Sequence, residues 1–240
     1  MENTFITTLE CSVQAINCLG ADVHEVILQL PQDTGPDYRP GQYLLLASQQ
    51  GEFSPFSIAS APAEGNRLRL QVLALNAEPM KLLAELQRDK RARVQLPFGD
   101  VTPDLADPAP LLLIAAGTGL AQMHSIIEQV RLQDSKVPVH LYWGAREMTD
   151  FYWVSAWAGW EAMDNVQLHR VVSHDESAEE RNGMLYEAVT KDIADLSGYR
   201  VIASGSPAMV YGTLDALVAH GMQPQQMQAD VFSYAPRPAQ

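Results

Sequence analysis

The sequence predicts a protein of the β + α/β class, in which an N-terminal antiparallel six-stranded β-barrel precedes a parallel α/β domain. Three observations predict this class. Residues 1–100 hold six short segments with strand-like apolar patterns, whereas residues 111–240 alternate apolar runs with helical patterns. Between them, residues 101–110 contain three prolines and two aspartates, a composition that suits neither helix nor strand. We therefore expect one domain over residues 1–103 and a second over residues 104–240.

Strands in the first half are predicted from apolar residues that alternate between turn signals. Val26, Leu28 and Leu30 follow this pattern, and the spacing of Met80 and Leu83 is helical instead. Six short strands within about 100 residues favour a small closed or half-closed barrel. The expected strands span residues 7–16, 23–30, 43–47, 56–60, 68–75 and 93–96, and the expected helix spans residues 79–87.

The second half repeats a strand and a helix several times. Residues 111–115 are all apolar, which is typical of a parallel strand buried on both faces. This rhythm predicts a parallel sheet with helices on both sides. We expect strands at residues 111–115, 137–143, 166–172 and 199–203, helices at 121–133, 151–163, 184–192 and 208–220, and a closing segment at 231–234.

Bulk properties exclude several classes of protein. A formal charge of −13 argues against nucleic acid or an anionic membrane as a partner, because both select basic surfaces. The chain has no run of 18 apolar residues, and its first residues lack an export signal, so we expect a soluble, cytoplasmic protein. Two cysteines are too few for an iron–sulfur cluster or a disulfide framework. The six histidines show no metal-ligand spacing, so no metal site is expected.

The run Gly117-Thr118-Gly119 follows the first predicted strand of the second half and precedes a predicted helix. Glycines at this place let the backbone approach a ligand, and the free amides of the first helical turn attract an anion. The segment is therefore a candidate phosphate cradle of a Rossmann-like nucleotide-binding domain. An ordinary strand–helix turn has the same glycines, and one Gly-x-Gly does not distinguish the two interpretations.

Several motifs in order resemble one family. Residues 39–43 read Arg-Pro-Gly-Gln-Tyr, residues 55–62 read Pro-Phe-Ser-Ile-Ala-Ser-Ala-Pro, and residues 97–100 read Pro-Phe-Gly-Asp. Ala-Gly-Thr-Gly at 116–119, Tyr-Trp-Gly-Ala-Arg at 142–146 and Ser-Gly-Ser-Pro-Ala-Met at 204–209 continue the series. Together they are similar to the ferredoxin–NADP reductase superfamily over nearly the whole chain. Within it, the chain most resembles the free-standing NAD(P)H:flavin reductases, including those that supply reduced flavin to bacterial luciferase.

The resemblance implies a flavin site on the barrel for FAD or FMN. The pair Phe56-Ser57 would lie against the isoalloxazine ring, with Ser57 as the catalytic residue whose hydroxyl approaches the nitrogen that accepts hydride. Taken alone, a hydroxyl after a proline equally suits a turn cap. The remaining residues expected around the ring are Pro55, Ile58, Ala59, Val72 and Leu73.

The resemblance also implies a site for NADH or NADPH at the carboxyl ends of the parallel strands. Arg146 would pair with a nucleotide phosphate, or alternatively with Glu147 or Asp150. Acidic residues at 175–180 would disfavour a second phosphate beside the adenosine ribose, which tilts the choice to NADH. Phe232 would cover the flavin ring or simply pack against the fold. The further residues expected at the nucleotide are Gly117, Thr118, Gly119, Gly205, Ser206, Pro207 and Met209.

Three departures from the family pattern bear on ligand binding. Ser54 replaces an arginine that usually binds the flavin phosphate, and residues 76–81 lack the usual Gly-x-x-Ser turn. Losing one charge-assisted contact removes about 1.5–3 kcal/mol, or roughly tenfold to a hundredfold in affinity. We therefore expect a loosely held flavin, with Lys81 as a candidate replacement cation. Ser204 stands where relatives often have a cysteine, so no role that needs a thiol is expected there.

The sequence thus predicts an oxidoreductase that transfers hydride from NAD(P)H to an exchangeable flavin (FMN, FAD or riboflavin), for use by a flavin-dependent oxygenase or another acceptor. Two alternatives remain open. One is a reductase with retained FAD that serves a protein electron acceptor. The other is a regulatory nucleotide- or flavin-binding module without turnover.

Overall fold

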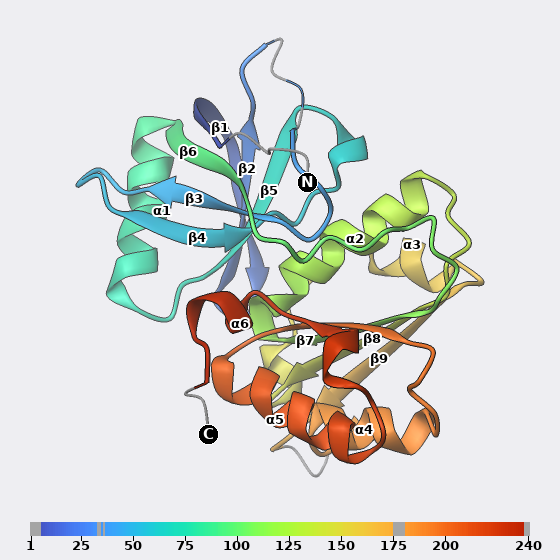
Figure 1. The fold of residues 1–240 in the computed structure, drawn as a ribbon. Helices are drawn as coiled ribbons and strands as arrows, with labels where there is room; N and C mark the ends of the chain where they lie inside the picture. The colour runs from blue at the N-terminus through green and yellow to red at the C-terminus, as the bar shows by residue number, and fades with distance from the viewer. Residues whose placement is uncertain (1–5, 33–34, 36, 175–180, 238–240) are drawn as a thin grey trace.

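A computed structural model describes residues 6–32, 35, 37–174 and 181–237. The first half forms an antiparallel six-stranded sheet in the order β4-β3-β6-β1-β2-β5 (Figure 1). A bridge between Ile58 and Leu70 links its two outer strands, which curls the sheet into a barrel. The strands are β1 (Thr7–Gly20), β2 (Val23–Gln29), β3 (Tyr43–Ala47), β4 (Phe53–Ser57), β5 (Arg67–Leu73) and β6 (Arg91–Phe98).

Alternate apolar side chains fill the barrel. Val26 and Leu28 on β2, and Leu68 and Leu70 on β5, are fully buried in one cluster, as the period-2 pattern predicts. Helix α1 (Ala77–Asp89) packs against this cluster through its buried leucines. A short 3₁₀ turn (Pro62–Glu64) follows β4.

The second half is a six-stranded parallel sheet in the order β10-β9-β8-β7-β11-β12. Leu111 and Leu113 face one core with helices α2 and α3, whereas Leu112 and Ile114 face another with α4, α5 and α6. Burial on both faces explains the unbroken apolar run. The strands are β7 (Leu111–Ala116), β8 (Val139–Ala145), β9 (Val166–Val172), β10 (Arg181–Asn182), β11 (Arg200–Ser204) and β12 (Met227–Gln228). The helices are α2 (Leu120–Leu132), α3 (Trp157–Glu161), α4 (Leu185–Asp192), α5 (Pro207–Ala219) and α6 (Val231–Tyr234), with 3₁₀ turns at Gly117–Gly119, Met148–Asp150 and Pro224–Gln226.

The structure confirms the expected fold class but moves several elements. Strand β4 starts at Phe53 rather than at residue 56, and residues 58–60 leave the strand. Only Trp157–Glu161 of the expected helix at 151–163 is helical, and the closing segment is the short helix α6.

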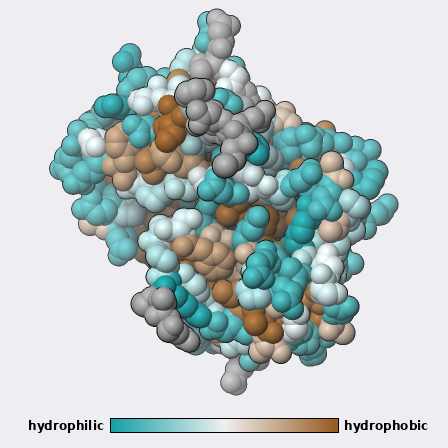
Figure 2. Space-filling model, in the orientation of Figure 1, coloured by the Kyte–Doolittle hydropathy of each residue, from teal (hydrophilic) through white to brown (hydrophobic). Residues whose placement is uncertain are grey.

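The segment between β6 and β7 contains no helix or strand, and the proposed boundary at residues 103–104 lies within it. The side chain of Arg200 donates hydrogen bonds to the carbonyls of Asp104, Asp107 and Ala109, and so fastens this segment to the start of β11. On the face drawn in Figure 2, hydrophobic surface lies along the middle of the molecule where the two halves meet. None of the described helices is long and apolar enough to cross a membrane.

Candidate active site

Two neighbouring pockets lie between the barrel and the parallel sheet. The larger of these two, of about 640 Å³, lies at the carboxyl ends of β7 and β8. This is the edge at which parallel α/β sheets bind ligands. The turn between β1 and β2 contributes Ala21 and Asp22, so the barrel also forms part of the wall. From the parallel domain, the lining residues include Gly117, Thr118, Arg146, Asp150, Tyr152, Ser173, Met184, Tyr186, Ser206 and Met209.

The smaller pocket, of about 370 Å³, lies beside it and is lined from both halves of the chain. The barrel supplies Pro55, Phe56 and Ser57 from β4, and Gln71 and Leu73 from β5. The parallel domain supplies Ala116, Thr118, Gly119 and Ala121, together with residues 204–206. The two pockets share Leu73, Ala116, Thr118 and Ser206, so they lie side by side, and we call the two together the hollow.

Glycine is required where the turn after β7 approaches the end of β11, its neighbour in the sheet. A Cβ atom on Gly119 would lie 2.3 Å from the carbonyl oxygen of Ser204, which is backbone and cannot move aside cheaply. A Cβ atom on Gly205 would lie 2.4 Å from Cε of Met209. The indole nitrogen of Trp143 donates to the carbonyl oxygen of Gly117 at 3.0 Å and fixes the turn. The bare backbone beside both pockets fits a cradle for a pyrophosphate.

A second helix begins at the same hollow. The hydroxyl of Ser206 caps α5 by accepting a hydrogen bond from the amide of Met209 at 3.3 Å. Pro207 occupies the first turn of α5, where its missing N–H costs no hydrogen bond. Ser206 lines both pockets and Met209 lines the larger one, whereas Pro207 lines neither.

Three of the residues expected at the flavin lie inside the barrel wall. Ile58, Ala59 and Val72 are buried and line neither pocket. The amide of Ile58 donates to the carbonyl of Gln42, and that of Ala59 donates to the carbonyl of Arg69. These backbone groups close the barrel at the residues that directly follow Phe56 and Ser57 in the chain.

Charge is sparse around the hollow. Arg146 is exposed on the larger pocket and makes no ion pair with any residue that the structure describes, Glu147 and Asp150 included. Among the described residues, the carboxylates that line the larger pocket are Asp22 and Asp150. None of the described residues that line the smaller pocket is charged. The acidic run at 175–180 lies outside the described residues.

Other expected groups line neither pocket. Phe232 packs on Tyr211, with ring centroids 5.5 Å apart, and lines neither pocket. Ser54 and Lys81 are exposed. Cys11 is buried and Cys18 is exposed, and both are free thiols. No cluster of described residues could hold a metal ion.

Sequence reasoning missed several lining residues of the barrel, among them Asp22 and Gln71. Asp22 lies in a turn where Gly20, Ala21 and Asp22 all have positive φ, and only this tight turn hinted at a special position. Gln71 is buried although it points away from the barrel core, because Tyr152 of the other half covers it. A polar residue inside an apolar strand was its only signal.

Comparisons with known proteins agree with this architecture. Residues 113–215 match the family model of the oxidoreductase NAD-binding domain. The chain is 30% identical over 230 residues to CDP-6-deoxy-L-threo-D-glycero-4-hexulose-3-dehydrase reductase of Yersinia pestis, which covers 94% of this chain and 69% of that protein. It is 28% identical over 239 residues to an NAD(P)H-flavin reductase of Vibrio harveyi, covering 95% of this chain and 99% of the relative.

The structure of an Amycolatopsis cytochrome P450 reductase superposes on this one with a TM-score of 0.84 at 25% identity, covering 93% of this chain and 69% of that one. The architecture, a barrel next to a parallel nucleotide-binding domain, and the sequence relatives point to the same family. The chain belongs to the ferredoxin–NADP reductase superfamily and is an oxidoreductase of the NAD(P)H:flavin reductase type.

Proposed function

We propose that this protein reduces an exchangeable flavin (FMN, FAD or riboflavin) with NADH or NADPH and releases the reduced flavin to an acceptor. The adjacency of the two pockets carries this proposal. Leu73, Thr118 and Ser206 line both of them, so a ring bound from the barrel side and a ring bound from the parallel domain would meet at a common wall.

Each half offers groups that suit one ligand. Phe56 and Ser57 would hold the flavin ring, and Gly117, Thr118 and Gly119 would hold the pyrophosphate of the nucleotide. When both are bound, a hydride leaves C4 of the dihydronicotinamide for the ring nitrogen of the flavin, which with one proton gives NAD(P)⁺ and reduced flavin. Ser57 would hold a hydrogen bond at that nitrogen, and the protein would keep the two rings in near contact.

The loose flavin follows from missing charge. The described lining of the smaller pocket is neutral, and Ser54 offers only a hydroxyl where relatives have an arginine. Binding would therefore depend on the ring rather than on the flavin phosphate. Free flavin would enter and leave as a substrate.

We further propose NADH as the preferred donor. Asp22 and Asp150 line the larger pocket together with Arg146, and a second phosphate would meet both carboxylates. The acceptor would be a flavin-dependent oxygenase or another protein partner. A cytoplasmic location is consistent with the exposed free thiol of Cys18, because reducing compartments preserve such thiols.

The test is steady-state oxidation of NADH and NADPH against FMN, FAD and riboflavin, with purified protein. We expect turnover with all three flavins and a higher kcat/KM for NADH. Yellow protein with stoichiometric FAD would favour the alternative of a retained cofactor. Absence of oxidation at saturating concentrations of every flavin would favour a binding module without turnover.

A further inference from the structure

Helix α2 connects the phosphate cradle to the barrel and is buried on every side. Its first residue, Leu120, directly follows Gly119, and residues 120–130 are all buried. Several of these buried side chains are polar, although such groups are costly to bury without partners. Their partners therefore reveal what the helix is attached to.

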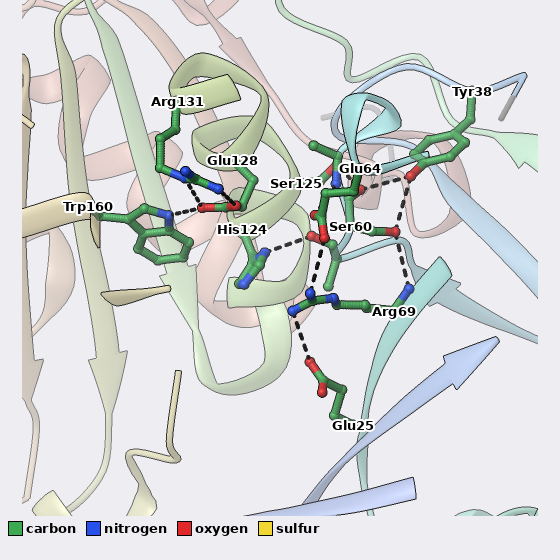
Figure 3. A network of polar contacts seen from close by, with 12 residues as sticks. Glu25, Tyr38, Ser60, Glu64, Arg69, His124, Ser125, Glu128, Arg131 and Trp160 are labelled. Atoms are coloured by element: carbon green, nitrogen blue, oxygen red, sulfur yellow. Dashed lines mark hydrogen bonds and ion pairs between the residues drawn. The ribbon is translucent and has the colours of Figure 1, made fainter. Parts of the chain in front are cut away.

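Three side chains of α2 donate hydrogen bonds to backbone carbonyls of the barrel. Nε2 of Gln122 donates to the oxygen of Gly41 at 2.7 Å. Nδ1 of His124 donates to the oxygen of Ala59 at 2.7 Å, and Oγ of Ser125 donates to the oxygen of Ser60 at 2.7 Å (Figure 3). The last two acceptors follow Ser57 by two and three residues along the chain.

The segment that receives these bonds is also fixed from its other side. The hydroxyl of Ser60 accepts a hydrogen bond from the amide of Arg69 at 3.1 Å and lies 3.1 Å from the hydroxyl of Tyr38. The amide of Ala59 donates to the carbonyl of Arg69. Residues 59 and 60 are thus held between β5 and α2, just after the β4 residues that line the smaller pocket.

His124 is held in one orientation by its neighbours. Its ring packs edge-on against Trp160, with centroids 4.9 Å apart, and the indole nitrogen of Trp160 donates to Glu128 at 2.6 Å. Arg131 makes an ion pair with Glu128 (Figure 3). Burial lowers the pKa of His124, so the ring is neutral. Since a carbonyl oxygen only accepts, Nδ1 carries the proton.

We infer that His124 and Ser125 are positioning residues, which set the distance between the flavin held at Phe56-Ser57 and the nicotinamide of the nucleotide whose pyrophosphate is held at Gly117–Gly119. This inference rests on the proposed function. The 3₁₀ turn of the cradle leads directly into α2, and the side chains of His124 and Ser125 on α2 hold the segment that follows Ser57, so the two rings are placed by one rigid element. Hydride transfer is sensitive to such placement, because an error of about 1 Å can lower the rate a hundredfold.

The main test compares His124→Leu with His124→Asn. Leucine keeps an apolar side chain against Trp160 but removes the donor, whereas asparagine places an amide N–H near the former Nδ1. We expect His124→Leu and Ser125→Ala to slow single-turnover hydride transfer at saturating ligands by about tenfold or more. We expect His124→Asn to recover most of the rate, even if its melting temperature is lower than that of His124→Leu. KM for flavin and for NADH changes by less than about twofold.

A second readout does not need turnover. We expect the long-wavelength absorbance of stacked rings, measured with oxidised flavin and a tetrahydro analogue of NADH that cannot transfer hydride, to weaken in His124→Leu and to recover in His124→Asn. The matched control is Asn165→Ala. Asn165 also donates to backbone carbonyls, those of Ser135 and Val137, but at the amino ends of β8 and β9, away from the carboxyl ends where the pockets lie.

Two results would overturn the positioning role. One is a hydride-transfer rate and stacking absorbance in His124→Leu and Ser125→Ala equal to those of the wild type. The other is an equal loss in Asn165→Ala, which would assign the effect to general destabilisation. If the wild type oxidises neither NADH nor NADPH with any flavin, the proposed function fails, and this inference falls with it.

Discussion

The hydroxyl of Tyr152 donates to Oε1 of Gln71 at 2.7 Å, and both side chains are buried. Tyr152 belongs to the parallel domain and lines the larger pocket, whereas Gln71 lies on β5 of the barrel and lines the smaller one. One hydrogen bond therefore joins the two halves at the boundary between the pockets. Burial also raises the pKa of Tyr152, so its hydroxyl stays protonated and available as a donor.

Replacing Tyr152 with phenylalanine should lower the free energy of unfolding by about 1–3 kcal/mol, because the buried amide oxygen of Gln71 loses its partner. Urea unfolding measures this loss. The double variant Tyr152→Phe with Gln71→Leu should recover much of the stability, since neither polar group is then left alone. Equal stability of Tyr152→Phe and the wild type would mean that the bond contributes nothing.

Ser54→Arg should tighten the binding of FMN roughly tenfold to a hundredfold, by restoring a charge-assisted contact worth about 1.5–3 kcal/mol. Riboflavin lacks the phosphate and serves as the matched control ligand. Titrations that follow the quenching of flavin fluorescence give both dissociation constants. An equal gain for riboflavin and FMN would show that the arginine acts on the ring and not on the phosphate.

Gly119→Ala should destabilise the protein by about 1–3 kcal/mol and weaken NADH binding more than flavin binding, because the new methyl group meets the backbone of Ser204. The control is Gly159→Ala within α3, where nothing lies within 4 Å of the added carbon. That change should be neutral or stabilising by up to about 1 kcal/mol. Thermal unfolding and NADH titration of both variants check the contrast.

Asp230 gives a prediction about pH. Burial raises its pKa from 3.8 to about 6, against the opposing effect of the hydrogen bond from Gln122 and with a smaller contribution from Asp100. The folded protein binds this proton more tightly than the unfolded chain. The contribution of Asp230 to stability therefore falls as pH rises from about 4 to about 6 and stays low above that range.

Asp230→Asn removes this titration. Above pH 6 the variant should exceed the wild type in stability by about 1–3 kcal/mol, and the difference should vanish near pH 3.5. Urea unfolding of both proteins between pH 3.5 and pH 8 measures it. A constant difference across this range would show that Asp230 has an ordinary pKa in the folded state.

Elements that depend on local pattern could be predicted from the sequence. The run at residues 111–115 is apolar on both faces because helices cover both, and the structure has β7 there. The start of β4 was expected too late in the sequence, because Pro55 weakens the strand pattern of residues 53–55. Its place at the end of the hydrogen-bonded sheet order tolerates a residue that cannot donate.

Features that depend on contacts between the barrel and the parallel domain could not be predicted from the sequence. The aromatic residues between 151 and 160 have helical spacing, but the amide of Trp153 donates to the carbonyl of Leu19 and Tyr152 reaches Gln71, so residues 151–154 do not form a helix. The turn at Gly117–Gly119 could be located from its local motif. Asp22, Gln71 and the partners of the buried polar residues of α2 could not, because they depend on the assembled fold. The roles expected of Ser57, Arg146 and Phe232 stay predictions.

The wall that the two pockets share at Leu73, Thr118 and Ser206 has a kinetic consequence. Because each ligand of the proposed reaction would have its own pocket beside this wall, neither would have to depart before the other arrives. The enzyme should therefore form a ternary complex, and double-reciprocal plots at several fixed flavin concentrations should intersect rather than run parallel.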